Sequence, residues 1–341
     1  MQRVICFISL LFSLGFAGQV NAAIDIDWPT ENRALLYGDE ERFFQPTISK
    51  RLISGKYGFV RTSQPEPARF FERFHEGIDI APLRRDAKGE PLDPVKAVAA
   101  GKVIYVNTRG DRSNYGIYVI IEHRFDGWPM YGLYSHLANH EVRTGQEVRK
   151  GQQLGLLGYT GSGINQERAH LHFEMTFRIT RDFSGWFEKA GVPLFEEKGP
   201  NHHGDHSGLA YLGVDPAPLL LASAAGRPIT VPQVFANEPV QFKVRVPSGG
   251  KYWYWQRQFP FQVVGGVDIP PPPAWEMSCN RIGIPLSFKR LDVPVAKAEL
   301  SWFRPGLSLQ EWFTRGLVEG RGGHERLSKH GHKWISQLTW D

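Results

Sequence analysis

An alternating run at residues 169–177 is the feature that most constrains how this chain can fold. Every second position of the run is apolar, namely Leu171, Phe173, Met175 and Phe177. A period of two is typical of a β-strand, in which side chains two residues apart lie on the same face. His170 and His172 therefore share the opposite face. Two adjacent imidazoles indicate a metal site, an acid–base pair or a chance pairing on a solvent face, and only the rest of the chain can separate these.

Short apolar runs separated by glycines fill residues 94–158 and predict further strands. Their close spacing indicates an antiparallel β-sandwich or barrel, because parallel sheets need helical crossovers between strands. Residues 94–106 and 145–155 also resemble the folded-over hairpins of lipoyl or biotinyl carrier domains, which are not enzymes. Lys150 does not lie at a tight hairpin tip, as a carrier lysine would, and this weakens the carrier interpretation.

A second group of candidate functional residues lies upstream, in the stretch His75-Glu76-Gly77-Ile78-Asp79-Ile80. On an extended segment, His75 and Asp79 lie on the same face, with the two isoleucines on the other. Gly77 between them allows a close approach or a bend. Taken alone, the pair is a weak signal, because a surface strand end gives the same spacing.

The remaining histidines carry weaker signals. His136 ends the strand predicted at 130–136 and opens a loop, whereas His123 is interpreted as a surface strand end and His140 as a loop residue. A group within residues 202–206 has metal-ligand composition: His202, His203, Asp205 and His206. A flexible polar loop at the rim of a cleft is the favoured interpretation of that group, because no regular element fixes a ligand geometry there.

Residues 1–22 are predicted to be a signal peptide, with Arg3, an apolar run at 4–16 and a small-residue cleavage site ending at Ala22. No later run is long enough for a transmembrane segment, so we expect an exported protein of the periplasm or cell wall. After removal of Cys6, Cys279 is the one cysteine of the mature chain. It can form no intramolecular disulfide, and any metal site must use histidines and carboxylates.

Size and charge add modest constraints. The 341 residues suggest two domains. The net charge of +5 suits a protein that works on an anionic surface such as a cell wall. No basic run is interleaved with aromatic residues on one face, so we expect no nucleic-acid partner.

Together, the motifs resemble those of a known family. His75-x-x-x-Asp79, a strand-ending His136 and His170-x-His172 occur in this order, with GQ-x-V-x-x-GQ-x-LG at 145–155 and VDP at 214–216. The chain resembles the lysostaphin-like, or LytM-type, zinc endopeptidases of bacterial peptidoglycan over about residues 55–221. The resemblance implies a mainly β fold, with a groove-bearing catalytic domain related to the barrel-sandwich hybrid. The implied division is a signal peptide at 1–22, an N-terminal segment at 23–54, a peptidase domain at 55–221 with an insertion at about 178–212, and a β-rich C-terminal region at 222–341.

Site roles follow from the resemblance residue by residue. It implies zinc ligands at His75, Asp79 and His172, and catalytic histidines at His136 and His170. Two imidazoles, one carboxylate and an open fourth position form a recognised catalytic zinc set, in which the metal activates a water. Which of His136 and His170 is the general base stays open.

The implied activity is hydrolysis of peptidoglycan stem or bridge peptides by a monomeric metallo-endopeptidase. In a Gram-negative host the bond would be the D-alanyl-diaminopimelate crosslink, and in another host a pentaglycine bridge. The alternative is a catalytically inactive relative that binds or activates another wall hydrolase. Such proteins typically lack one or more site residues, and all five are present here.

The flanking regions leave alternatives open. Residues 24–54 are expected either to cover the groove, with Asn32 reaching the metal, or to pack against the back of the sandwich. If they cover it, a chain beginning near Ser54 should be more active. In the C-terminal region we expect strands within 228–246 and 287–302 and a short helix at 308–317. The aromatic cluster at 252–255 is either core or a sugar-stacking surface.

Overall fold

A computed structural model describes residues 23–48, 50–61, 73–190, 201–308, 311 and 313–340. The predicted signal peptide and Cys6 lie outside these residues. Within the described ranges, no helix combines the length and the apolar character that a membrane crossing requires.

Antiparallel β-structure dominates the first half of the described chain, as the sequence predicts. A nine-stranded sheet has the order β11–β10–β7–β6–β5–β8, with β3 added to β10, and β9 pairing with both β7 and β4. Its strands are β3 (Ile78–Ile80), β4 (Pro94–Lys96), β5 (Gly101–Asn107), β6 (Ile117–Phe125), β7 (Trp128–His140), β8 (Glu147–Val148), β9 (Gln153–Leu157), β10 (Leu171–Arg178) and β11 (Tyr211–Val214).

Short helices and turns connect these strands. They are the 3-10 turns η3 (Gly110–Arg112), η4 (Gln166–Arg168), η5 (Gly204–His206) and η6 (Gly208–Ala210), and the helices α2 (Phe183–Ala190) and α3 (Pro216–Ala224). Asp215 begins α3, because its carboxylate accepts the backbone N–H of Ala217 at 3.0 Å. The insertion at 178–212 therefore contains α2 and two ordered turns in its described part.

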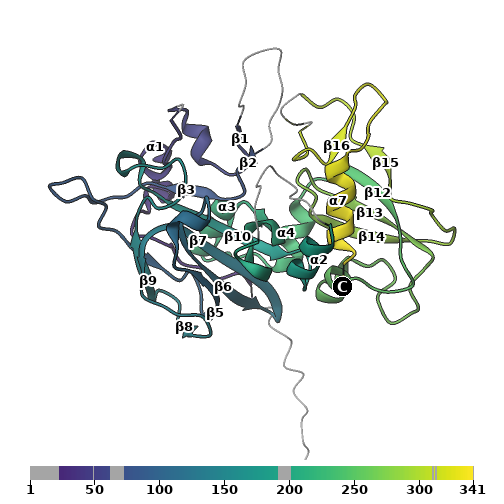
Figure 1. Ribbon diagram of the computed structural model, residues 1–341, viewed down its shortest axis with the longest axis horizontal. Coiled ribbons are helices and arrows are strands. Elements are labelled where there is room, and N and C mark those ends of the chain that lie inside the picture. Colours follow the sequence, from purple (N-terminus) through teal and green to yellow (C-terminus); the bar gives the residue numbers. More distant parts are fainter. Residues whose placement is uncertain are drawn as a thin grey trace, which may run out of the picture.

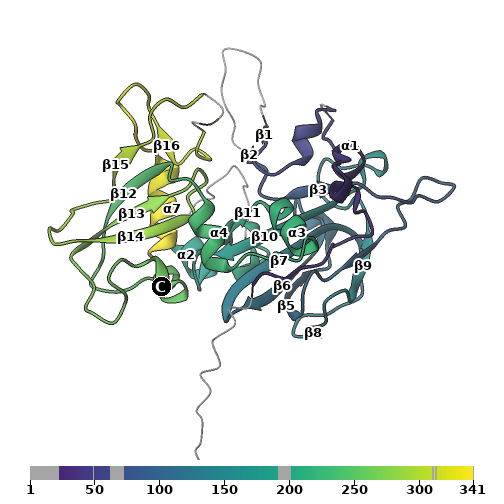
Figure 2. The same ribbon diagram turned by 180° about the vertical axis from the view of Figure 1, so that it is seen from behind.

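The N-terminal segment belongs to the hydrophobic core. It contains η1 (Ala34–Tyr37), α1 (Glu40–Phe43) and η2 (Leu52–Gly55), and a small ribbon of β1 (Val60–Arg61) and β2 (Arg73–Phe74) follows. Five of its apolar residues are at most 5% exposed: Ile24, Ile26, Trp28, Phe43 and Phe44. Backbone bonds tie the segment to the sheet domain, such as the one from Lys96 N to Pro29 O at 2.8 Å. In Figure 2 this purple segment crosses the back of the sheet, as the second alternative predicts for residues 24–44.

A chain that begins at Ser54 is therefore expected to be destabilised rather than activated. It would lose five buried apolar side chains, each contributing about 1.5–3 kcal/mol, which together rival a typical total stability of about 5–15 kcal/mol. Thermal unfolding followed by circular dichroism should show a lower or absent transition for this chain. A chain beginning at Ala23 is the matched control, and equal melting temperatures for the two would contradict the prediction.

The C-terminal region forms a second lobe, which is β-rich as predicted. Its four-stranded sheet has the order β14–β13–β12–β15. The elements are α4 (Val231–Asn237), β12 (Phe242–Pro247), α5 (Tyr254–Gln258), η7 (Pro260–Gln262), β13 (Ala274–Cys279), β14 (Pro285–Leu291), β15 (Glu299–Phe303), β16 (Val318–Glu319), β17 (Arg326–Leu327) and α7 (Lys329–Leu338).

Two details of this lobe differ from the sequence-based expectation, and a third settles an open alternative. The first of the two strands predicted within 228–246 is wrong, because a Thr230–Gln233 capping box begins helix α4 there. Helix α7 was not predicted, and the short helix expected at 308–317 lies partly outside the described residues. Of the two interpretations of the aromatic cluster, the core interpretation is confirmed for Trp253 and Trp255, which are 1% and 0% exposed.

The two lobes meet along the end of strand β10. Figure 1 shows the nine-stranded sheet on one side, the C-terminal sheet with α7 on the other, and β10, α2 and α4 between them. Phe177 of β10 stacks on Phe235 of α4 with ring centroids 4.6 Å apart. A partly buried ion pair also joins the lobes, since Arg315 Nη2 lies 2.7 Å from Glu76 Oε1. The strand that carries His172 is thus shared by both halves of the core.

Candidate active site and metal centre

Sheet register places the two sequence clusters together. Strand β3 pairs with β10 so that Asp79 lies opposite His172, while Ile78 and Ile80 lie opposite apolar residues of β10. Because directly opposed residues share a face, Asp79 and His172 project to the same side. Gly77 permits this approach, since a Cβ there would lie 2.4 Å from the carbonyl oxygen of Phe173.

Three donor atoms converge at this point. Asp79 Oδ1 lies 2.9 Å from His75 Nε2 and 2.9 Å from His172 Nδ1. The two imidazole nitrogens are 3.1 Å apart. His75 Nδ1 donates to the carbonyl of Lys56 at 2.7 Å, which leaves the lone pair of Nε2 for the cluster. All three side chains are at most 7% exposed.

This donor set fits a metal ion. Tetrahedral zinc with bonds of about 2.0–2.2 Å separates its donors by roughly 3.3–3.5 Å, slightly more than the separations found here. Two imidazoles and a carboxylate are also the right chemistry for zinc. His75, Asp79 and His172 form the one group of potential metal-holding residues in the described ranges.

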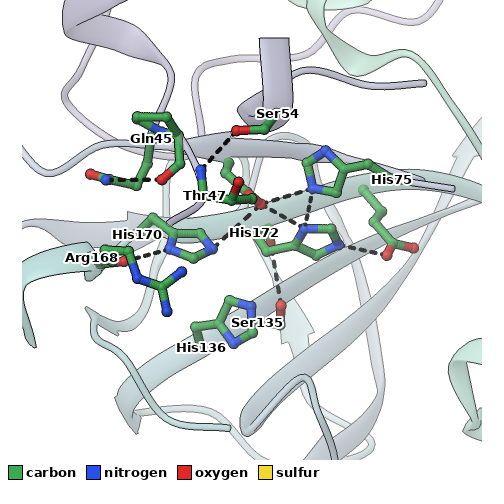
Figure 3. A network of polar contacts seen from close by, with 12 residues as sticks. Gln45, Thr47, Ser54, His75, Ser135, His136, Arg168, His170 and His172 are labelled. Carbon is green, nitrogen blue, oxygen red and sulfur yellow. Dashed lines mark hydrogen bonds and ion pairs between the residues drawn. The ribbon is translucent and has the colours of Figure 1, made fainter. Parts of the chain in front are cut away.

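The other two predicted histidines lie beside the three donors, as Figure 3 shows. His170 Nε2 is 3.4 Å from Asp79 Oδ1, and the ring centroids of His136 and His170 are 4.8 Å apart. His170 Nδ1 donates to Arg168 O at 2.7 Å, and His136 Nδ1 donates to Thr160 O at 2.9 Å. Both rings therefore keep Nε2 as the nitrogen available for chemistry.

An unusual backbone conformation brings His136 to this face. Ser135 lies opposite His172 in the β7–β10 ladder, so regular alternation would send the next side chain to the other face. His136 instead has φ of 62°, in the left-handed region that non-glycine residues seldom adopt. The turned backbone lets its ring join the other histidines, and such conformations concentrate at functional sites.

The charges of the cluster are strongly coupled. Burial alone would raise the pKa of Asp79, but His75 and His170 hold it well below its ordinary value. Burial would lower the pKa of His172, yet hydrogen bonds to Asp79 and Glu174 raise it to about 9. Burial and the neighbouring His170 and His172 keep the pKa of His136 well below its usual value, so His136 is neutral at pH 7.

The N-terminal segment reaches this site through residues other than Asn32. The hypothesis that Asn32 approaches the metal is wrong, because its Nδ2 donates to the carbonyls of Arg42 and Ala81 at 2.9 and 3.0 Å. The backbone of Gln45 instead pairs with Asp79, with N to O at 2.9 Å. Figure 3 shows Gln45, Thr47 and Ser54 along the same side of the histidine cluster.

The other histidines considered from the sequence have structural roles. His203 Nε2 donates to Arg112 O at 3.0 Å and His203 Nδ1 accepts from Tyr105 at 2.9 Å, so the 202–206 group is an ordered packing turn and not a flexible loop. His123 lies inside β6 with no exposed surface, and its interpretation as a surface residue is wrong. His140 ends β7, where its Nδ1 donates to Val142 O at 3.0 Å.

Two residues of the site have no assigned role in the sequence pattern, namely Glu174 and Tyr115. Glu174 Oε1 lies 2.7 Å from His172 Nε2, and the hydroxyl of Tyr115 donates to the same oxygen at 2.8 Å. The period of two could have indicated Glu174, because it shares a strand face with His170 and His172. No sequence signal connects Tyr115 to them.

Comparison with known proteins agrees with this geometry. Residues 73–182 match Peptidase family M23. Lipoprotein NlpD of Yersinia enterocolitica is 33% identical over 94 residues, which cover 27% of this chain and 87% of that protein. Peptidoglycan DD-endopeptidase ShyA of Vibrio cholerae is 33% identical over 141 residues, which cover 40% of this chain and 28% of that protein.

The murein hydrolase activator NlpD of Escherichia coli is 34% identical over 106 residues, which cover 30% of this chain and 23% of that protein. The chain spans about a quarter of the length of the most similar curated relatives. The matched stretch includes all five histidine and aspartate residues of the site. By sequence match and by its antiparallel β architecture, the chain belongs to Peptidase family M23.

Proposed function

We propose that this protein is a zinc-dependent endopeptidase that hydrolyses peptide crosslinks of bacterial cell-wall peptidoglycan. One observation carries the proposal: His136 and His170 lie directly beside the three-donor group of His75, Asp79 and His172. A purely structural metal site would not need two further buried imidazoles directly beside its donors. Their presence favours hydrolysis over metal storage or structural support.

His75, Asp79 and His172 would hold the zinc. Bound zinc would supply a Lewis acid that polarises the scissile carbonyl and acidifies a water molecule. His136, neutral at pH 7, can accept a proton, and a protonated His170 or His136 can donate one to the leaving amine. Either imidazole can also donate a hydrogen bond to the oxyanion that develops on the carbonyl oxygen.

Peptidoglycan stem or bridge peptides are the proposed substrate. A relative that is 33% identical is named as a peptidoglycan DD-endopeptidase, and the crosslink between stem peptides is the bond that such an enzyme cleaves. The net charge of +5 suits an anionic wall polymer. The proposed location is therefore the periplasm or the cell wall, reached through the predicted signal peptide.

Digestion of purified sacculi tests the function directly. Metal-free protein, zinc-loaded protein and the His136→Asn variant would be incubated with sacculi, and the soluble muropeptides separated by chromatography and mass spectrometry. We expect crosslinked dimers to decline and monomers to rise only with the zinc-loaded wild type. An unchanged muropeptide profile with zinc fully bound would overturn the endopeptidase assignment.

The second candidate is an activator of another cell-wall hydrolase. It is favoured by the match to a relative named as a murein hydrolase activator, at 34% identity over 106 residues. Against it stands the complete set of five site residues in one buried cluster. The same sacculus assay separates the two: stimulation of an added wall amidase, with no cleavage by this protein alone, would establish the activator.

Activity is expected to fall on the acid side of neutrality in two separable steps. Zinc and protons compete for His172, whose pKa of about 9 in the metal-free protein shows how strongly its carboxylate neighbours hold a proton. Lowering the pH therefore releases zinc first. His136 has a pKa well below its usual value and gains its proton only at lower pH, so loss of the base follows zinc loss.

A pH–rate profile at two zinc concentrations checks this order. Excess zinc should shift the loss of activity that is due to zinc release to lower pH. The loss that is due to protonation of His136 should stay at the same pH. At the lower zinc concentration, a flat rate from about pH 5 to 8 would contradict competition between zinc and protons for His172. An optimum near about pH 5 with zinc bound would point to a carboxylate such as Glu76 or Glu174 instead.

A further inference from the structure

His172 differs from His75, the other histidine donor, because both of its ring nitrogens face carboxylates. Its Nδ1 faces Asp79 Oδ1 at 2.9 Å, and its Nε2 faces Glu174 Oε1 at 2.7 Å. A neutral imidazole carries one proton, so it offers a lone pair on one nitrogen only when the proton resides on the other. A carboxylate at Nε2 therefore favours the tautomer whose lone pair lies on Nδ1, toward the metal-binding group.

Glu174 is placed to act on the Nε2 side of the His172 ring. It follows His172 by two residues on β10, so both side chains lie on one strand face. It is 2% exposed, and it is absent from the group of donors that lie within 4.8 Å of one another. The carboxylate stands on the far side of the His172 ring from Nδ1, and so it acts on the metal through the imidazole.

Tyr115 fixes the carboxylate in turn. Its hydroxyl donates to Glu174 Oε1 at 2.8 Å, and its ring centroid lies 5.6 Å from that of His172. The oxygen that receives the His172 proton thus has a second donor that holds it in place. A lone glutamate on a strand could rotate away from the imidazole, whereas a glutamate bonded to the partly buried phenol of Tyr115 is held in one rotamer.

The inserted segment holds Tyr115 against this carboxylate. A Cβ at Gly208 would lie 2.5 Å from Tyr115 Cε2, so the turn η6 packs directly on the ring. Tyr118 flanks the ring on another side, with centroids 5.6 Å apart. The insertion therefore contacts the metal centre indirectly, through Tyr115, Glu174 and His172 in that order.

We propose that Glu174 is a positioning residue for the metal, held by Tyr115, and that it fixes His172 with its proton on Nε2 and its lone pair on Nδ1. The inference rests on the proposed zinc site. It assigns a role to two residues outside the five that the sequence motifs identify. It also implies that the insertion at 178–212 supports the metal centre by packing on Tyr115.

Zinc affinity of the metal-free protein tests the inference without relying on activity. Wild type, Glu174→Ala, Glu174→Gln and Tyr115→Phe would each be titrated with zinc against a chromophoric chelator at pH 7.5. We expect Glu174→Ala to bind zinc about 10–100-fold more weakly, the usual effect of removing the hydrogen-bond partner of a ligating histidine. Glu174→Gln keeps an acceptor oxygen and should lie between wild type and the alanine variant, and Tyr115→Phe should show a smaller loss.

Glu122→Gln is the matched control, since it changes a strand glutamate that pairs with Arg124 away from the site. Each variant would also be melted without metal, and its cobalt-substituted form examined by visible absorption. A Glu174→Ala variant with wild-type zinc affinity would overturn the inference. If that variant does not fold, unchanged affinity in both Glu174→Gln and Tyr115→Phe would overturn it.

Failure of the underlying zinc site has a different signature. A wild-type protein that binds no zinc in this titration would overturn the metal centre itself, whatever the variants do. Wild-type binding with an altered cobalt spectrum in Glu174→Ala and an unaltered one in Glu122→Gln supports the positioning role. A simple loss of stability would lower the melting temperature without changing that spectrum.

Discussion

His172→Ala is expected to reduce the zinc content of the purified protein from about one ion per chain to near zero. The substitution removes one of three donors and leaves Asp79 buried beside a void, so the two remaining ligands hold the metal poorly. Zinc should be measured by mass spectrometry after dialysis against metal-free buffer. Activity on sacculi should disappear together with the metal.

His324→Ala is the control for this experiment, because His324 is exposed and lies far along the chain from the cluster. It should retain both zinc and activity. A His172→Ala protein that is folded and keeps its zinc through dialysis would contradict the ligand assignment. A residue other than His172 would then have to be the third zinc ligand beside His75 and Asp79.

His136→Ala is expected to keep its zinc and lose turnover by about 10²–10⁴-fold, the range for an acid–base residue. Its ring centroid lies 5.9 Å from that of His172, and it is not one of the three converging donors. Zinc content and the rate of muropeptide release should therefore separate in this variant, although they fall together in His172→Ala.

Backbone strain complicates the alanine substitution, because position 136 has φ of 62°. Asparagine tolerates the left-handed region better than alanine, so His136→Asn removes the imidazole with less cost to the fold. Both variants should lose turnover to a similar extent. Loss of zinc in both, or full activity in either, would contradict a catalytic role separate from metal binding.

Short-range sequence periodicity predicted two pairs of residues of this site, and the family resemblance implied that the pairs belong together. The period of two at His170 and His172 predicted a shared strand face, and the spacing of His75 and Asp79 predicted another. The structure joins the two faces by pairing β3 with β10, and a slip of one residue would have replaced Asp79 with an isoleucine. The register across that distance is set by packing of Ile78 and Ile80, which local pattern alone does not specify.

Other features depend on contacts that no local pattern contains. The left-handed backbone at His136 lies where the pairing of β7 with β10 ends. The side-chain amide of Asn32 donates to the backbone carbonyls of Arg42 and Ala81. The apolar run at 231–235 fits a strand or a buried helix equally well, and a cap at Thr230 decided for the helix. Tyr115 meets Glu174 only because the whole sheet is folded.

The contact between Phe177 and Phe235 has a consequence for how this protein could be recombined with other proteins. The stretch matched to the family, residues 73–182, carries every histidine of the site, and it also carries Phe177 without the helix that covers it. A graft of that stretch alone would expose the aromatic end of β10 and leave Glu76 without Arg315. The smallest exchangeable piece is therefore larger than the catalytic motifs suggest, and it includes the C-terminal lobe.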